Sequence, residues 1–251
     1  MNILSKIFSK NKLTCELGYR IVPLGTYCLP RVIATLSMLK PRKAAGEKTL
    51  PFDLGFFWNF DGILDTLDNE FSIFYDDIKY GLLDDKAVTR DLQALFGGYN
   101  SEAKHWVSNN LSAIFNHEYM MENIDAFKER YDSRIENFYE YVKDNKYEIY
   151  FLIASFSEIS EYQIKRLKSI INRYRNSESY SIIIINQCSH AYKINQKNVY
   201  VIDEIDETFY NMSVSNNTNW VSALKRKNDF PAAKKFYEEV TGDLKKIILK
   251  I

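Results

Sequence analysis

Two dense apolar runs in the last third of the chain constrain its fold most. Residues 147–156 read YEIYFLIASF and residues 180–186 read YSIIIIN, and both are rich in β-branched and aromatic side chains. Neither run alternates between apolar and polar residues, which is typical of strands buried on both faces of a parallel sheet. Residues 160–175 have a helical pattern, and residues 198–202 form a third apolar run. This spacing predicts strand–helix–strand units with right-handed crossovers.

The first strand of this sheet is expected much earlier in the chain. Residues 20–25 read RIVPLG, a short apolar run that ends at Gly25, where the strand should turn. Residues 29–40 predict a helix, because Pro30 sits in its first turn and Pro41 stops it. We therefore predict an open, mostly parallel α/β sheet that is flanked by helices.

The long interval between these strands is predicted to be a helical insertion. The chain shows no repeat and no long polar linker, so we predict a single α/β domain over residues 1–251, with a helix-rich insertion at about 55–145. Residues 41–50 predict an exposed loop. Further expected elements are helices over residues 1–12, 62–67, 101–112, 122–145 and 231–250, short helices and loops over 68–100, and a loop over 213–219.

Charge and cysteine content exclude several classes of protein. The chain has 33 Lys and Arg against 33 Asp and Glu, so we expect no nucleic-acid partner. Three cysteines form no disulfide framework, and no run of about 18 apolar residues exists to span a membrane. Residues 1–12 lack the apolar centre of a secretory signal, although they would allow weak peripheral membrane contact. We expect a cytoplasmic protein and leave its oligomeric state open.

The segment Leu24-Gly25-Thr26-Tyr27-Cys28 carries the most informative chemistry. It places Cys28 between a strand end and a helix start, where backbone N–H groups and the helix dipole lower the pKa of a thiol. The same N–H groups would stabilise an oxyanion, and Gly25 would let the backbone turn sharply beside the nucleophile. The alternative is that Cys28 is a small buried residue at a strand–helix junction.

A nucleophilic cysteine needs a base, and the chain has three histidines. His105 lies in a helical pattern next to Trp106, which is typical of a half-exposed surface residue. His117 lies in the loop-like sequence FNHEY, where a scaffold can hold a catalytic side chain, although a histidine there can also cap a turn. His190 follows Cys188 at the end of a predicted strand and forms a rival pair.

Other residues fit either a site or a structural role. Asp53, in Pro51-Phe52-Asp53, either orients the histidine and lines the pocket or caps a turn. Arg31, close after Cys28, either binds an anionic substrate group or forms a surface salt bridge. Cys15 is expected to be structural. No zinc-ligand spacing and no phosphate-binding loop occurs, so we expect no metal and no cofactor.

Five short motifs together resemble a bacterial family of unknown function described as "putative papain-like cysteine peptidases". They are LGxxC with an arginine after it, PFD, FxH, the helical pattern RYxxRIxxF, and a tryptophan near the C-terminus. In this chain they are carried by Leu24, Gly25, Cys28 and Arg31; by Pro51, Phe52 and Asp53; by Phe115 and His117; by Arg130, Tyr131, Arg134, Ile135 and Phe138; and by Trp220. The family's apolar strand after the helix matches the segment around Tyr150 to Ile153. Leu54 stands where the family usually has tryptophan.

The resemblance implies a Cys28–His117 catalytic pair. It also implies a papain-like α+β fold, with a helical lobe and an antiparallel barrel, as the alternative to the parallel sheet. We expect a cysteine-dependent hydrolase or acyltransferase in which Asp53 supports the pair and Arg31, Gly25 and Trp220 line the substrate site. Its substrate would be a small molecule, a peptide or a glycan. The alternative is a non-catalytic sugar- or nucleotide-binding module linked to surface polysaccharide biosynthesis.

Overall fold

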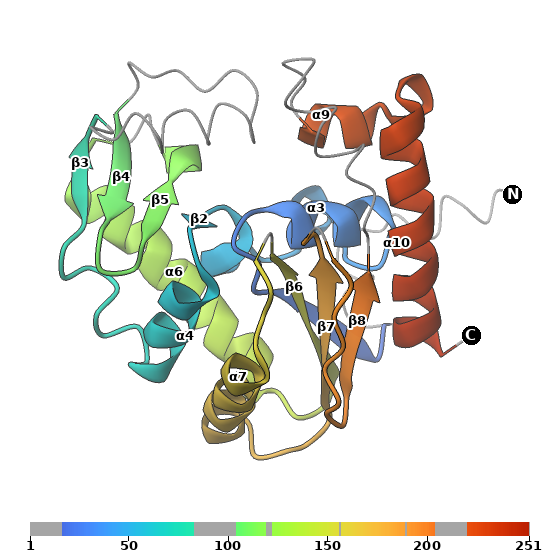
Figure 1. Ribbon diagram of the computed structural model, residues 1–251. Coiled ribbons are helices and arrows are strands. Elements are labelled where there is room, and N and C mark those ends of the chain that lie inside the picture. The colour runs from blue at the N-terminus through green and yellow to red at the C-terminus, as the bar shows by residue number, and fades with distance from the viewer. Residues whose placement is uncertain are drawn as a thin grey trace, which may run out of the picture.

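Four parallel strands form the central sheet of the computed structural model (Figure 1). Their order is β1-β6-β7-β8, and every neighbouring pair is parallel. The strands are β1 (Tyr19–Pro23), β6 (Glu148–Ser155), β7 (Tyr180–Asn186) and β8 (Val199–Asp203). The structure describes residues 17–82, 104–118, 122–155, 157–188, 190–203 and 220–250.

The two central strands are buried on both faces, as their composition predicts. All residues of β7 are buried, and in β6 only Glu148 is not. Alternate side chains of β6 enter two different apolar cores: Phe151 packs in one and Leu152 in the other. The lack of polar alternation in both strands follows from this double burial.

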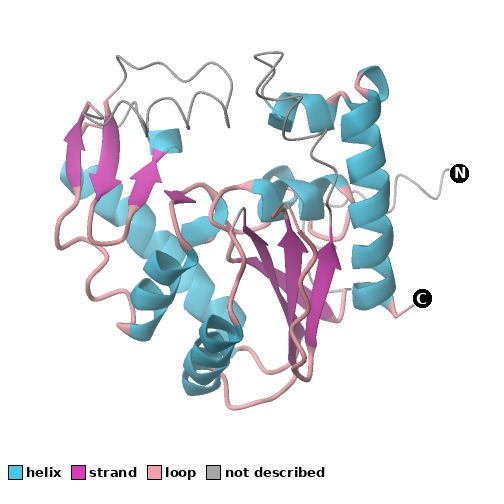
Figure 2. Cartoon of the chain, in the orientation of Figure 1, coloured by secondary structure: helices cyan, strands magenta, loops and turns pink. Residues whose placement is uncertain are grey.

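Helices cover both faces of the parallel sheet (Figure 2). One face packs against α3 (Leu29–Leu36) and α10 (Pro231–Leu249), and the other packs against α6 (Ile124–Lys143) and α7 (Glu161–Tyr174). Helix α7 begins with a capping box in which Ser160 accepts a hydrogen bond from the Gln163 backbone N–H. Helix α9 (Trp220–Lys225) and the 3₁₀ turn η4 (Lys227–Asp229) precede α10.

A second, antiparallel sheet lies to one side of the parallel sheet (Figure 1). Its strand order is β2-β5-β4-β3, and helix α4 follows β2. Gly62 lets α4 approach the turn between β4 and β5, since a Cβ at this position would lie 2.1 Å from the carbonyl oxygen of Leu111. The elements are β2 (Phe56–Phe57), α4 (Phe60–Asp68), β3 (Lys79–Gly81), β4 (His105–Ser108) and β5 (Ala113–Phe115).

This sheet corrects two expectations about the insertion. The predicted helix over residues 101–112 is wrong, because residues 105–108 form β4, which is paired with both β3 and β5. The insertion is also less helical than expected, since it holds all four strands of the antiparallel sheet. Pairing with neighbouring strands supplies the backbone hydrogen bonds of these short segments, and no local sequence pattern predicts this pairing.

Two further differences lie after β1. Helix α3 ends at Leu36 rather than at Lys40, and the N–H groups of Leu39 and Lys40 both bond the carbonyl of Ala34. The segment expected to be an exposed loop contains the 3₁₀ turn η1 (Lys43–Ala45) and the buried side chain of Glu47. The charged group of Glu47 is buried because it finds partners inside the fold.

The α/β expectation is confirmed for the parallel sheet. The described residues between 148 and 203 form no antiparallel barrel, because their three strands all pair in parallel. The expected helix over 1–12, Cys15 and the expected loop over 213–219 lie outside the described residues, as does much of 68–100. Among the helices that the structure describes, none is both long and apolar enough to cross a bilayer.

Candidate functional site

Cys28 lies at the junction between β1 and α3. The chain leaves β1 along β6, with hydrogen bonds from Leu24 N–H to the Leu152 carbonyl (2.9 Å) and from Thr26 N–H to the Ala154 carbonyl (3.1 Å). Cys28 is then the N-cap residue of α3, and its carbonyl accepts the hydrogen bond of Val32 N–H at 3.0 Å. The predicted strand–turn–helix placement of the thiol is therefore present.

Gly25 is required by close packing within this junction. A Cβ at Gly25 would lie 2.4 Å from Cγ of Pro30 and 2.9 Å from the Tyr27 carbonyl oxygen. The chain bends over residues 26–28, directly after Gly25, and Gly25 does not have a positive φ. The glycine instead leaves room for the proline ring in the first turn of α3.

Burial dominates the acidity of Cys28. The residue is 7% exposed, and burial raises the pKa of its thiol to about 12. The backbone hydrogen bond at the helix start and the positive charge of Lys225 lower this pKa, while the Asp53 carboxylate raises it. The expectation that the helix start favours the thiolate is thus overturned, because desolvation outweighs the backbone.

Asp53 lies in the same buried neighbourhood. It ends the 3₁₀ turn η2 (Pro51–Asp53), and its Oδ2 accepts a hydrogen bond from Leu50 N–H at 2.9 Å. Oδ2 also lies 3.5 Å from Nη1 of Arg31, whereas Oδ1 has no hydrogen-bond partner among the described residues. Burial raises the pKa of Asp53, and the charge of Arg31 opposes this shift.

Arg31 is held by carboxylates and by a backbone carbonyl. Its Nη1 lies 3.5 Å from Asp53 and 4.0 Å from Oε1 of Glu47, and it donates to the carbonyl of Lys48 at 3.4 Å. The side chain is 13% exposed. Arg31 therefore links the loop after α3 to the first turn of α3, next to Cys28. Its ion pairs are largely buried, so the alternative of a surface salt bridge does not hold.

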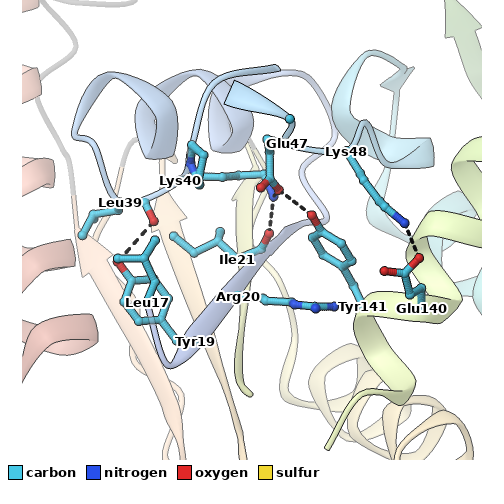
Figure 3. Close-up of a pocket in the computed structure, with 12 residues that line it drawn as sticks. Leu17, Tyr19, Arg20, Ile21, Leu39, Lys40, Glu47, Lys48, Glu140 and Tyr141 are labelled. Atoms are coloured by element: carbon cyan, nitrogen blue, oxygen red, sulfur yellow. Dashed lines mark hydrogen bonds and ion pairs between the residues drawn. The ribbon is translucent and has the colours of Figure 1, made fainter. Parts of the chain in front are cut away.

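A cluster of buried charges next to Arg31 was missed by the sequence reasoning (Figure 3). Nζ of Lys40 donates to the Ile21 carbonyl at 2.8 Å and lies 2.5 Å from Oε1 of Glu47. Tyr141 donates its hydroxyl to the same oxygen at 3.0 Å. Burial lowers the pKa of Lys40, and Glu47 opposes the shift. The cluster borders a cavity of about 110 Å³.

His117 follows the antiparallel sheet in the chain. It lies in the 3₁₀ turn η3 (Asn116–Glu118), directly after β5, and its side chain is exposed. Strand β5 pairs Ile114 with Phe56 of β2, and both of these side chains share the apolar core of Cys28. No hydrogen bond joins His117 to Cys28 within the described part of the chain, so their pairing stays a prediction.

The rival pair is arranged differently. Nε2 of His190 lies 3.3 Å from Oε2 of Glu158, and this histidine side chain is 60% exposed. Cys188 is buried in the core on the other sheet face from Cys28, and burial raises the pKa of its thiol. Its N–H bonds Oδ1 of Asn186 at 2.9 Å, as in an Asx turn. The structure therefore gives His190 a carboxylate partner.

The positions of His105 and Trp220 complete the comparison with the sequence-based expectations. His105 is buried in β4, opposite Gly81, and is not the half-exposed helical residue that was expected. Trp220 is the first residue of α9, but its side chain lies outside the described residues.

The RYxxRIxxF pattern forms a second charged cluster, on α6. Glu118 is buried and accepts hydrogen bonds from Nη1 of Arg130 and from Nη2 of Arg134. The guanidinium of Arg134 lies over the ring of Tyr131, 4.4 Å from its centroid. This cluster fixes the end of η3, and hence the residue that follows His117, against α6.

Comparison with known proteins places these features in a family. No curated protein and no solved structure matches the chain. One family model matches residues 19–191, a range that includes Cys28, Asp53, His117 and the arginines of α6. Because the match covers more than half of the sequence, the chain belongs to the family described as "Putative papain-like cysteine peptidase (DUF1796)".

Proposed function

We propose that the chain is a cysteine hydrolase that cleaves a carbonyl substrate with Cys28 as its nucleophile. The observation that carries the proposal is the position of Cys28, at the end of β1 and at the N-cap of α3, beside the buried Asp53–Arg31 pair. Backbone N–H groups at a helix start are suited to stabilise an oxyanion. The family description supports a cysteine enzyme.

The high pKa of Cys28 determines how the nucleophile is generated. With a pKa of about 12, the resting side chain is a thiol at neutral pH rather than a preformed thiolate. Its proton must therefore leave as the sulfur attacks, and this requires a general base. We assign this role to His117, because β5 ends beside the core that holds Cys28.

The chemical step conserves atoms and charge. Sγ of Cys28 forms a bond to the carbonyl carbon while its proton passes to His117, and the bond to the leaving group breaks as that proton is returned to it. Water then cleaves the thioester and releases the acid and the thiol. Asp53 acts as a positioning residue, since its contacts hold Arg31 and Leu50.

An ester assay tests this proposal. We expect the full chain to release p-nitrophenolate from p-nitrophenyl acetate and to carry an acetyl group on Cys28 that mass spectrometry locates. Cys28→Ser should lose both signals, and His117→Ala should slow acetylation by about 10²–10⁴-fold. Cys188→Ser is the matched control and should retain both signals.

Four results would contradict parts of the proposal. Hydrolysis that survives Cys28→Ser places the nucleophile elsewhere. Unchanged acetylation in His117→Ala, combined with a loss in His190→Ala, identifies the other histidine as the base. Transfer of the acetyl group to an added alcohol in preference to water identifies an acyltransferase. If no cysteine is acetylated, Cys28 is a structural thiol and the binding-module alternative is favoured.

A further inference from the structure

A polar groove lies between the loop after α3 and helix α6. Its volume is about 730 Å³, within the range of small-molecule sites. The loop contributes residues 43 and 46–49, and α6 contributes side chains between Ala126 and Asn137. Among these described lining residues, the cations are Lys43, Lys48, Arg130 and Arg134.

Arg134 makes the groove a built site rather than a charged surface. Its side chain is 8% exposed, and its guanidinium is fixed by Glu118 through Nη2 and by stacking on Tyr131. Its Nη1 is buried and has no hydrogen-bond partner among the described residues. An unpaired buried donor of this kind is costly unless a ligand or water accepts from it.

The charge balance of the groove favours an anion. Glu118 is one carboxylate shared by two arginines, and the exposed Lys43 has no ion pair within the described part of the chain. Of the two lining carboxylates, Glu47 is already bonded to Lys40 and Tyr141, as Figure 3 shows. Only Glu129 opposes an incoming negative charge.

We propose that this groove binds the oxyanion group of a small ligand, either a carboxylate or a phosphate. Arg134 supplies a fixed positive charge in the groove wall, and the more exposed Arg130 and Lys43 supply charge at the rim. A planar guanidinium suits both oxyanions, because its N–H groups match their paired oxygens.

The groove is also joined to Cys28. The carbonyl of Lys48, a lining residue, accepts a hydrogen bond from Arg31, which lies three residues after Cys28 in the chain. This link runs through the backbone of the loop after α3, and the proposed oxyanion binding does not depend on the proposed function.

NMR titration of the ¹⁵N-labelled full chain tests the binding. Inorganic phosphate and acetate are added in separate arms at constant ionic strength, with chloride as the reference anion. We expect saturable shifts of the Gly46, Thr49 and Ser133 amides with at least one oxyanion, and the responding arm shows which oxyanion the groove prefers. No saturable shift in either arm, or equal shifts with chloride, overturns the proposal.

Matched charge reversals localise the site. Lys43→Glu should weaken binding by about tenfold or more, whereas Lys193→Glu, an exposed lysine outside the groove lining, should change the Kd by less than about twofold. An equal Kd in Lys43→Glu and the wild type overturns the assignment. Both positions are exposed, so neither variant should unfold the chain.

Cys28→Ser separates this proposal from the proposed function. The variant should bind the oxyanion with unchanged affinity, because Cys28 does not line the groove. Binding without Cys28-dependent hydrolysis rejects the hydrolase and retains the groove. Cys28-dependent hydrolysis without saturable oxyanion binding rejects the binding groove and retains the hydrolase.

Discussion

Two influences of opposite sign act on the Cys28 thiol. A helix start usually makes a cysteine more acidic, yet this side chain is 7% exposed and its pKa is raised to about 12. The Asp53 carboxylate adds to the rise, and Lys225 only partly offsets it. A nucleophile in this setting depends on a base during the reaction and not on its own acidity.

Alkylation of Cys28 should therefore show an unusual pH dependence. We expect the rate of iodoacetamide labelling to keep rising between pH 7 and about pH 11, because an ordinary thiol has its pKa near 8.5 and this one near 12. Mass spectrometry of the peptide that contains Cys28 measures the rate, with N-acetylcysteine as the reference. A plateau below pH 9 would show that the thiol ionises more readily than its burial implies.

Gly25→Ala should destabilise the protein, because the new methyl group meets the Pro30 ring at 2.4 Å. We expect a loss of about 1–3 kcal/mol in the free energy of unfolding, the usual cost of overpacking, measured by urea denaturation. Gly242→Ala in α10 is the control, since a Cβ there meets no atom within 4 Å. That change should increase stability by about 0.5–1 kcal/mol through helix propensity. Equal effects at both sites would refute the packing argument.

At the scale of elements, α4 and α7 are held together by charges. Arg166 of α7 donates to Asp65 and Asp68 of α4 at 2.8 Å each, and Arg173 also bonds Asp68. Hydrogen bonds from Arg173, which has the larger effect, and from Arg166 lower the pKa of Asp68. A network with two arginines on one carboxylate contributes more than an isolated surface pair.

Asp68→Asn should loosen this helix pair by about 1 kcal/mol at pH 7. Because the folded pKa of Asp68 lies below its ordinary value of 3.8, its contribution is present above that pH and is lost as the pH falls below it. The difference in unfolding free energy between wild type and variant should therefore shrink in acid. Urea titrations at pH 7 and pH 3 measure it, and a difference that grows on acidification would contradict the network.

Sequence patterns predict the elements of this fold unevenly. The run Ile182–Ile185 is apolar throughout because every position is buried, so the strand is evident from composition alone. His105–Ser108 has a helical sequence pattern but forms a strand, because its pairing with β3 and β5 determines its structure and no local pattern contains that pairing. Short strands that depend on their neighbours are therefore the part that local reasoning misses.

At the scale of the whole molecule, the parallel sheet separates two apolar cores. The core on the α6 and α7 side extends into the antiparallel sheet, since Trp106 and Phe115 pack in it together with Phe151. The other core joins α3 and α10 to the sheet and includes Cys28. The middle strands β6 and β7 contribute to both cores, so they lie in the best-protected position of the fold.

Amide hydrogen exchange should be slowest in β6 and β7 and fastest in β3. Opening β6 exposes both cores, whereas β3 is an edge strand with three residues that are exposed or half-buried. Exchange measured by mass spectrometry at neutral pH tests this order. Equal protection of β3 and β7 against exchange would contradict the predicted order.

Only those parts of the candidate site that depend on local sequence could be predicted. The strand–helix junction at Cys28 follows from the apolar run and Pro30, and the neighbourhood of Asp53 follows from the family motif. The contacts of Lys40 with Glu47 and of Tyr141 with Glu47 could not be foreseen, since charged residues normally lie at the surface and Tyr141 is 94 positions away from Glu47. Tertiary burial also reversed the expected acidity of Cys28.

The burial of Cys28 has a consequence for oxidative chemistry. Peroxide attacks thiolates that solvent can reach, and it converts them stepwise into sulfenic, sulfinic and sulfonic acids. A thiol that is 7% exposed with a pKa of about 12 meets neither condition, so the resting protein should survive peroxide concentrations that inactivate enzymes with preformed thiolates.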